Sequence, residues 1–323
     1  MIQIALIGAG QIGSRHLQAL ALLDIPARIF VVDPSTASLQ TANERHNEVR
    51  KPDAEDNIFY ATTMEFLPEE LDVAIIATSA DGRLEVLRQL LDNTKVKYLI
   101  LEKVVFNVSS HFEVAGELLR NAGCTAFVNC TRRVHGIYQD LRRIFHRSNI
   151  IEFAVEGPLW DIGCNGIHFL DLFSFLSGDS VDRLNSAFLD PDIHPSKRDG
   201  YDAFYGTVIG SSAKDAILRL SSFDASVQKE MRINIISDNA IANVDETNGS
   251  AILRQKEDGW AETIIPFKML YQSQLSHIIV EQLISNGACM LTPFDECVNN
   301  HVQIIKALNS YIGNAEDCRC PIT

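Results

Sequence analysis

The first thirteen residues constrain the fold of this chain more than any other segment does. An apolar run, residues 4–7, leads into the turn 8–13, which has the pattern GxGxxG, and a helical stretch, 14–20, follows. The first glycine permits a tight bend, the second lets the backbone approach a phosphate, and the third lets helix and strand pack closely. The helix N-terminus adds N–H groups and the positive end of a dipole. The segment therefore predicts a dinucleotide pyrophosphate site formed by Gly8, Gly10, Gln11, Ile12 and Gly13.

A second apolar run, residues 28–32, ends in Asp33, which lies twenty positions after Gly13 (33 − 13). An acidic side chain at this point of a dinucleotide-binding fold accepts hydrogen bonds from the ribose hydroxyls of adenosine. Asp33 would also repel the 2′-phosphate of NADP, and the next two residues, Pro34 and Ser35, supply no arginine to bind it. We therefore expect NAD, with NADP the less favoured cofactor. A simpler interpretation, in which Asp33 only caps the following helix, stays open.

Length and composition indicate an ordinary globular protein. A chain of 323 residues suggests two domains, each with its own hydrophobic core. The net charge of −14, without clusters of lysine and arginine, argues against a nucleic-acid partner. No apolar run is long enough to span a membrane, and the opening residues lack the basic start of a signal peptide.

The seven cysteines have no disulfide-type spacing, which is typical of a chain in a reducing compartment. Cys318 and Cys320 lie close together, but no histidine is near them in the sequence, so no metal site is expected. We expect a cytoplasmic protein.

The two halves of the chain differ in pattern, and together they predict an α/β protein. Strand and helix signals alternate over residues 1–130, which predicts a Rossmann-type, doubly wound parallel sheet in a dinucleotide-binding domain. Residues 131–323 predict an α+β domain with a largely antiparallel, open sheet for substrate binding and oligomerisation. Its strand-like runs and its two long C-terminal helices are residues 203–210, 215–221, 230–237, 240–244, 251–254, 275–285 and 294–311.

Polar residues follow two further strands of the first domain, and ligands in open α/β sheets bind at such carboxyl ends. Thr78 and Ser79 form a small polar turn that we expect beside the nicotinamide ribose. Lys103 follows an apolar strand, where a lysine can take or give the proton of a substrate hydroxyl. Glu102 would either hold a ribose hydroxyl or tune Lys103. The alternative for this pair is a solvated ion pair on a loop.

These motifs resemble the glucose–fructose oxidoreductase / inositol dehydrogenase / MocA (Gfo/Idh/MocA) family of NAD(P)-dependent dehydrogenases. The family also has a helix of the form Gly-x-His-x-x-Asp-x-x-x-x-Leu-x-Gly, which residues 166–178 match. The resemblance covers essentially the whole chain, and it is specific to the family and not to one substrate. It implies that Lys103 is the catalytic lysine and that His168 is a proton relay or substrate ligand.

The chain departs from the family pattern at three positions. An aspartate commonly lies four residues before the histidine, and here that position is Cys164, followed by Asn165. The proline after the lysine is Val104. The departures leave Lys103 and His168 as the proton-transfer pair. Asp161 lies seven residues before His168 (168 − 161), but the glycines at 163 and 166 argue against a continuous helix reaching back to it.

Three residues are candidates for binding the substrate beside Lys103 and His168. Asn165 would bind a sugar hydroxyl, Arg133 an acidic group such as a carboxylate or phosphate, and Trp160 would form an apolar wall for a sugar ring. Structural alternatives stay open for Arg133, Trp160 and His168: a solvated surface arginine, a core tryptophan and a helix-terminal histidine packed under a loop. Asp171 is expected to make a local structural contact on the helix of His168.

The sequence therefore predicts an NAD(P)-dependent oxidoreductase that moves a hydride between nicotinamide and a secondary alcohol or ketone. The resemblance implies a sugar, sugar acid or nucleotide-sugar as substrate, with bacterial surface-sugar biosynthesis as one setting, and a homodimer or homotetramer formed through the C-terminal sheet. Two alternatives remain. One is a dinucleotide-binding regulatory protein without turnover, and the other is an epimerase or lyase that retains its NAD.

Overall fold

The computed structural model describes residues 1–50, 57–146, 148–224, 226 and 230–323, and it divides into two compact units. The first unit contains residues 1–106, 111–129 and 270–295, and the second contains 107–110, 130–269 and 296–323. No helix among the described residues is long and apolar enough to cross a membrane.

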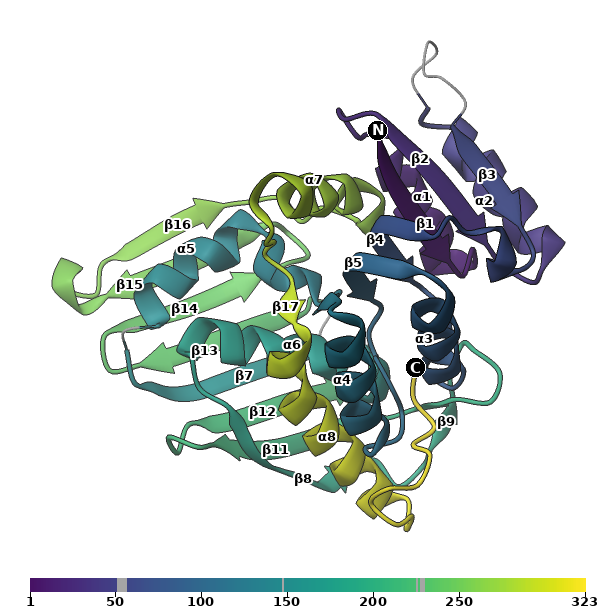
Figure 1. The fold of residues 1–323 in the computed structure, drawn as a ribbon. Coiled ribbons are helices and arrows are strands. Elements are labelled where there is room, and N and C mark those ends of the chain that lie inside the picture. Colours follow the sequence, from purple (N-terminus) through teal and green to yellow (C-terminus); the bar gives the residue numbers. More distant parts are fainter. Residues whose placement is uncertain (51–56, 147, 225, 227–229) are drawn as a thin grey trace. The chain divides into compact units, whose positions relative to one another are not determined.

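The first unit is built on a sheet of seven strands among its described residues. Six of them are parallel, in the Rossmann order β6-β5-β4-β1-β2-β3, and β17 pairs antiparallel with β6 at one edge (Figure 1). The strands are β1 (Ile2–Ile7), β2 (Ala27–Val32), β3 (Ile58–Ala61), β4 (Glu70–Ile76), β5 (Lys95–Leu101), β6 (Thr125–Val128) and β17 (Thr292–Pro293). The predicted doubly wound parallel sheet is confirmed.

Helices cover both faces of this sheet. Helices α1 (Gln11–Leu20) and α2 (Thr36–Asn47) pack together on one face, and α3 (Arg83–Asn93) and α4 (His111–Ala122) pack together on the other. The central strands are apolar without alternation because both of their faces are covered, and residues 73–76 of β4 are completely buried. Two short 3₁₀ turns, η1 (Met64–Phe66) and η4 (Gln272–Gln274), complete the unit together with α7 (Ser276–Asn286).

The segment Leu270–Asp295 groups with the first unit, although the sequence pattern assigned all of 131–323 to the second. Two contacts account for this: β17 hydrogen-bonds to β6, and η4 and α7 pack against α1. A helical pattern shows that a helix exists, but it does not show which core buries it.

The second unit is built on a sheet of eight strands among its described residues, in the order β16-β15-β14-β13-β7-β12-β11-β8. Neighbouring strands are antiparallel except β7 and β12, which confirms the expected largely antiparallel sheet. The strands are β7 (Ile150–Pro158), β8 (Val181–Leu189), β11 (Gly206–Ser212), β12 (Ile217–Phe223), β13 (Arg232–Ser237), β14 (Ala240–Asp245), β15 (Ser250–Gln255) and β16 (Glu262–Pro266).

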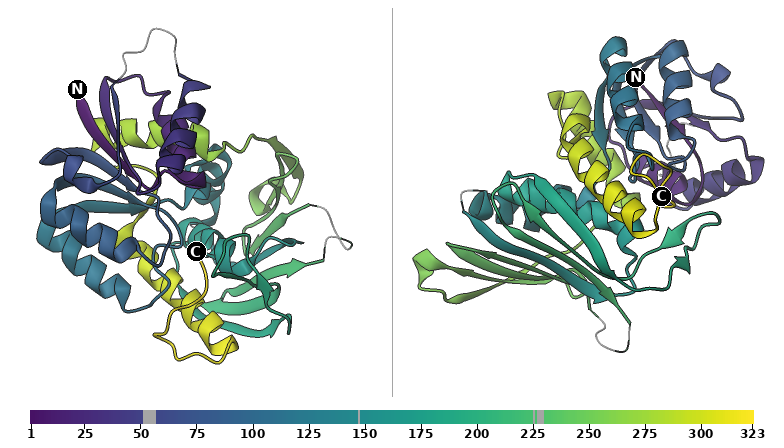
Figure 2. Two further views of the ribbon diagram at one scale, coloured as in Figure 1. Left: turned by 90° about the vertical axis from the view of Figure 1, so that its right-hand side faces the viewer. Right: turned by 90° about the horizontal axis from the view of Figure 1, so that it is seen from below.

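Helices α5 (Gly136–Phe145) and α6 (Ile162–Ser177) lie on one face of this sheet, and most of α8 (Phe294–Tyr311) also belongs to the unit. Among the described residues of the unit, no helix covers the opposite face (Figure 2). The smaller elements are η2 (Thr131–Val134), the hairpin β9 (His194–Pro195) and β10 (Asp202–Ala203), and η3 (Lys256–Asp258).

Candidate functional site

The glycine turn joins β1 to α1 as predicted. Gly8 has a φ of +93°, and a Cβ atom there would lie 2.9 Å from the backbone of Ala77. A Cβ atom on Gly13 would lie only 1.9 Å from the carbonyl oxygen of Gly8, so helix and strand approach too closely for any side chain. By contrast, a Cβ atom on Gly10 would meet nothing within 4 Å. The first and third glycines therefore serve the fold, and the second faces open space.

The N-terminus of α1 has the features of an anion-binding site. Gly10 is its N-cap and no side chain caps the helix, so its first N–H groups lack the partners that a capping side chain would supply. Arg45 of α2 lies beside this end of the helix, where its guanidinium donates to Gln11 Oε1 at 2.8 Å and to Ser14 Oγ at 2.5 Å. A positive charge, a helix dipole and unpaired N–H groups thus coincide at the predicted pyrophosphate site.

Asp33 lies at the carboxyl end of β2, and its carboxylate supports the turn. Its Oδ2 atom accepts a hydrogen bond from the N–H of Ala9 at 2.7 Å, and Oδ1 accepts one from the N–H of Ser35 at 2.8 Å. The N-cap of α2 is Ser35, so Asp33 is not the cap of that helix. Each carboxylate oxygen keeps a further lone pair, which leaves acceptor capacity for ribose hydroxyls.

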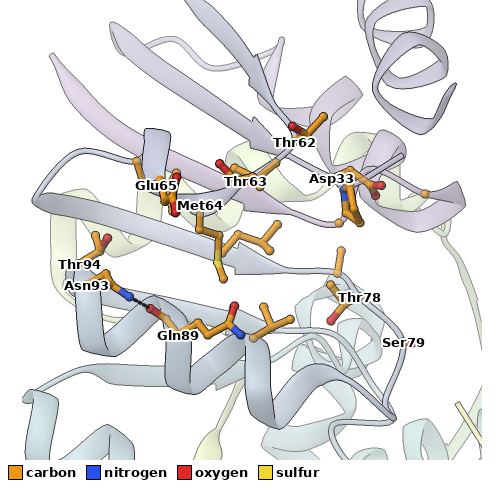
Figure 3. Close-up of a pocket in the computed structure, with 18 residues that line it drawn as sticks. Asp33, Thr62, Thr63, Met64, Glu65, Thr78, Ser79, Gln89, Asn93 and Thr94 are labelled. Carbon is orange, nitrogen blue, oxygen red and sulfur yellow. Dashed lines mark hydrogen bonds between the residues drawn. The ribbon is translucent and has the colours of Figure 1, made fainter. Parts of the chain in front are cut away.

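A pocket of about 990 Å³ lies along the carboxyl ends of these strands, within the first unit (Figure 3). Asp33 and Thr78 lie toward one end of it, and Glu65, Asn93 and Thr94 lie toward the other. Of the predicted cofactor residues, it brings together Gly8, Gly10, Asp33, Thr78 and Ser79. The size is within the range of small-molecule and cofactor sites.

The sequence interpretation missed half of this pocket. The residues after β3 and those on α3 that line it are Thr62, Thr63, Met64, Glu65, Leu67, Val86, Gln89, Asn93 and Thr94. The rule that ligands bind at the carboxyl ends of strands, applied to β3, would have pointed to Thr62 and Thr63. The α3 residues carry no such signal, because a helix that lines a pocket looks like any other amphipathic helix.

The residues that line the pocket have the properties that binding of a dinucleotide requires. Gly10 presents bare backbone to open space, and Asp33 has acceptor capacity to spare. Thr78 Oγ1 is buried and has no hydrogen-bond partner among the described residues, as expected of a hydroxyl that a ligand would pair. These residues match the requirements of a phosphate–ribose ligand.

Lys103 is half-buried and lies two residues beyond the end of β5. The loop that carries it is fixed by Arg83, which is 2% exposed. The guanidinium of Arg83 donates to the carbonyl oxygens of Glu102, Val104, Val105 and Thr78. Because Thr78 lines the pocket, Arg83 ties the lysine loop to the cofactor pocket.

Glu102 was one of the expected ribose ligands, but its surroundings do not suit that role. The residue is 4% exposed, and its Oε1 atom accepts hydrogen bonds from His16 Nε2 at 2.8 Å and from Asn129 Nδ2. A buried carboxylate that already bonds to the protein is poorly placed to bind a ribose. The second role that the sequence suggested, an influence on Lys103, fits its position better.

In the second unit, α6 begins at Ile162, four residues before the helix pattern that starts at Gly166 (166 − 162), and runs unbroken through both glycines. Asp161 is its N-cap, and Asp161 Oδ1 accepts from the N–H groups of Gly163 and Phe204. A Cβ atom on Gly163 would come within 2.8 Å of Phe204 and Ile322 side chains. The glycine is thus required by close packing, and the expected break in the helix was wrong.

Cys164 and His168 are half-buried and four residues apart, so they lie on one face of α6. Asn165 is also half-buried, and its amide Nδ2 donates to the carbonyl of Trp160 at 2.6 Å. Trp160 is 7% exposed, donates from Nε1 to Ser221 and packs edge-on against Phe169. The tryptophan is therefore a core residue and not the exposed wall that a sugar ring would need.

Arg133 is likewise a buried residue that contacts other parts of the protein. It is 6% exposed and pairs bidentately with Asp171, with nitrogen–oxygen distances of 3.0 Å and 2.8 Å. The guanidinium stacks over Phe175, and Glu296 lies 3.5 Å away. We therefore correct the expectation that Arg133 binds an acidic substrate group. Asp171 makes a structural contact, and its partner Arg133 lies on η2.

Two alanine variants should separate the roles of the glycines. Gly13→Ala forces a backbone shift, and we expect it to lower the free energy of unfolding by about 3 kcal/mol or more. Gly10→Ala should leave that free energy nearly unchanged and weaken NADH binding by roughly 1–3 kcal/mol, because the methyl group would meet the phosphates. Denaturant unfolding and a fluorescence titration with NADH measure the two quantities. Equal loss of stability in both variants would contradict the assignment.

The parallel sheet, the glycine turn and the pocket define a dinucleotide-binding protein of the Rossmann class. Residues 2–130 match the model of the GFO_IDH_MocA family, described as an oxidoreductase family with an NAD-binding Rossmann fold. The matched residues form the predicted dinucleotide-binding domain, and the family's description agrees with the motifs of that domain and with the expected cofactor, NAD. A search of curated protein sequences gave no match.

Solved structures resemble the chain over nearly its whole length. One is the UDP-N-acetylglucosamine 3-dehydrogenase GnnA from Acidithiobacillus ferrooxidans, with 16% identity, a TM-score of 0.75, and 96% of this chain and 99% of that chain covered. Another is an oxidoreductase from Agrobacterium radiobacter in complex with NAD⁺, L-tartaric acid and magnesium, with 16% identity, a TM-score of 0.73 and 96% of each chain covered.

A third similar structure is a super-repressor mutant of Gal80p from Saccharomyces cerevisiae, with 12% identity and a TM-score of 0.73, covering 97% of this chain and 96% of that chain. At these identities the three structures show the fold, and the fold is common to proteins with different named activities.

Proposed function

We propose that this protein is an NAD-dependent oxidoreductase that acts on a secondary alcohol or ketone of a sugar, sugar acid or nucleotide-sugar. The observation that carries the proposal is the pairing of a dinucleotide pocket with a lysine loop that Arg83 ties to it. The name of the similar UDP-N-acetylglucosamine 3-dehydrogenase supports a sugar-type substrate, and bacterial surface-sugar biosynthesis is a setting consistent with it.

Bound NAD supplies the hydride chemistry of this reaction, as the acceptor or donor of the hydride. The residues of the chain bind and orient the substrate, and they move its hydroxyl proton. In the oxidation direction, the neutral amine of Lys103 takes the proton of the substrate hydroxyl as the carbinol carbon loses its hydride. In the reduction direction, the ammonium group returns that proton to the oxygen. We propose that His168, from the second unit, assists this transfer and that Asn165 binds a sugar hydroxyl.

The function is tested by the absorbance of nicotinamide. Purified protein is mixed with NAD and, in turn, with sugars, sugar acids and nucleotide-sugars, and with NADH and the corresponding ketones. We expect turnover with at least one member of these classes. If none changes the absorbance although NADH binds, the proposal of a dehydrogenase is overturned.

Two other functions are consistent with the same pocket. One of the similar structures is a super-repressor mutant of Gal80p, and this similarity supports the first alternative, a dinucleotide-binding regulatory protein without turnover. An epimerase or lyase that retains its NAD would convert a substrate without net formation of NADH. Product analysis by mass spectrometry separates these cases, because only the epimerase or lyase changes the substrate while the absorbance stays constant.

Asp33 is proposed to favour NAD over NADP. We expect Asp33→Ala to weaken NADH binding and to shift the ratio of NADH to NADPH affinity by roughly tenfold or more, since a repulsive charge beside the 2′-phosphate is removed. Asp72→Ala is the matched control, because Asp72 also accepts a backbone N–H bond, from Gln3, but does not line the pocket. An unchanged affinity ratio in Asp33→Ala would refute this role.

The uncovered face of the C-terminal sheet supports a homodimer or homotetramer (Figure 2). Its side chains are half-buried and include a polar ladder in which Asn243 bonds to Asn234 at 2.8 Å and to Arg254 at 2.9 Å. We propose that this face is the contact between subunits. We further propose a cytoplasmic location.

A further inference from the structure

Five polar side chains from separate segments meet inside the first unit. They are His16 of α1, Glu102 after β5, Asn129 after β6, Gln272 of η4 and Ser276 of α7. Four of them are at least 95% buried, and Gln272 is half-buried. The sequence gave no sign of this cluster, because its members lie up to 260 residues apart.

The direction of most hydrogen bonds in the cluster follows from one carboxylate. Burial by itself raises the pKa of Glu102, but the hydrogen bond and the positive charge of His16, the charge of nearby Lys103 and the hydrogen bond from Asn129 outweigh it and hold the pKa below its ordinary value. Glu102 is therefore ionised at neutral pH and can only accept. The amide group of Asn129 must then point its Nδ2 atom at Glu102.

The same Nδ2 atom of Asn129 also lies 2.8 Å from the side-chain oxygen of Gln272, which fixes the orientation of that second amide. Gln272 consequently directs its Nε2 donor at Ser276 Oγ, at 3.0 Å, and the same nitrogen lies 3.2 Å from His16 Nδ1. Ser276 Oγ also lies 2.7 Å from His16 Nδ1. The other ring nitrogen, Nε2, faces the ionised Glu102, which can only accept, so Nε2 carries a proton.

We propose that His16 is a positioning residue that acts on Lys103 through Glu102, as a hydrogen-bond donor. The inference rests on the proposed function in one respect, namely that Lys103 moves the proton. Glu102 immediately precedes Lys103, so its side chain anchors the lysine loop from one side. Arg83 anchors the carbonyl groups of the same loop from the other side.

The hydrogen bond between His16 and Glu102 also joins two segments of the first unit. His16 lies on α1, the helix that begins at the glycine turn. The element that would hold the pyrophosphate and the loop that carries Lys103 are therefore joined by a side-chain hydrogen bond of 2.8 Å. The bond keeps the proton-transfer group in a fixed place relative to the cofactor pocket.

Two substitutions of His16 test the proposal. His16→Gln supplies one donor and one acceptor without a charge, whereas His16→Leu supplies neither. We expect His16→Leu to lower kcat by on the order of 100-fold, with little change in NADH affinity, because a small displacement of a proton-transfer group is costly. His16→Gln should restore most of kcat. The same two substitutions at His46, a buried histidine of α2 outside the cluster, are the control for loss of a buried ring.

Other outcomes would overturn the proposal. If stability and NADH affinity fall together with kcat in His16→Leu, the residue is merely structural. If His16→Gln is as impaired as His16→Leu, an uncharged hydrogen-bond donor at this position does not position the lysine loop and the proposed role of His16 is wrong.

The protonation state itself is read from nitrogen NMR of protein labelled with ¹⁵N-histidine, which needs no turnover. We expect His16 to carry a proton on Nε2. A ring whose Nε2 lacks a proton refutes the hydrogen bond to Glu102 alone. Absence of turnover in the wild-type protein refutes the proposed function, and the catalytic role of His16 with it.

Discussion

Replacing Lys103 with alanine is expected to lower turnover by roughly 100- to 10,000-fold, the range that a positioned proton-transfer group contributes. The affinity for NADH should stay near that of the wild-type protein, because Lys103 does not line the dinucleotide pocket. Lys103→Arg should be impaired as well, since a guanidinium stays protonated and cannot accept the proton of a hydroxyl. Steady-state kinetics and a fluorescence titration with NADH measure the two effects.

Lys95→Ala is the matched control for this experiment. Lys95 lies on the same strand, β5, at its opposite end, and its side chain is exposed in an ion pair with Glu70. Turnover should be unchanged in that variant. Full turnover in Lys103→Ala would contradict the proposed role of the lysine, and loss of NADH binding together with turnover would show that the loop itself had been disturbed.

Asp171→Ala is expected to lower the free energy of unfolding by about 3–5 kcal/mol. The substitution removes the buried, bidentate partner of the Arg133 guanidinium and leaves only Glu296, which is 63% exposed and 3.5 Å away. Breaking a buried ion pair in this way is strongly destabilising. Replacing both partners, as in Arg133→Met with Asp171→Leu, should recover much of that stability, because the apolar pair leaves no charge to desolvate. Denaturant unfolding of the three proteins gives the comparison.

An exposed ion pair on α5 provides the control for Asp171. Asp140 and Arg143 are both more than half exposed, and Asp140→Ala should change the free energy of unfolding by less than about 1 kcal/mol. If Asp171→Ala kept full stability and instead raised KM for the substrate, Arg133 would return to the substrate-binding role that its sequence position suggested.

The parts of the fold that the sequence predicted well depend on neighbours in the chain. The glycine turn, the acid after β2 and the lysine after β5 each lie at a strand end, and strand ends can be read from short apolar runs. Helix α6 shows the limit of such reasoning. Its glycines suggested a break, but they are required by close packing against residues far along the chain, Phe204 and Ile322 at Gly163 and Ile304 at Gly166.

The features that sequence reasoning missed depend on contacts between distant segments. Strand β8 has no clean alternation, and β16 is largely exposed, so neither gave a pattern. Arg133 and Trp160 were given to the substrate because a charged or aromatic residue in a connecting segment looks accessible. Their burial is decided by Asp171, Phe169 and Ser221, whose proximity only the folded structure reveals.

The central claim is that the glycine turn, Asp33 and the adjoining pocket hold NAD. A fluorescence titration of the wild-type protein with NADH and with NADPH tests it most directly. We predict saturable binding of NADH at one site per chain, tighter than that of NADPH. Binding of neither nucleotide would contradict the account.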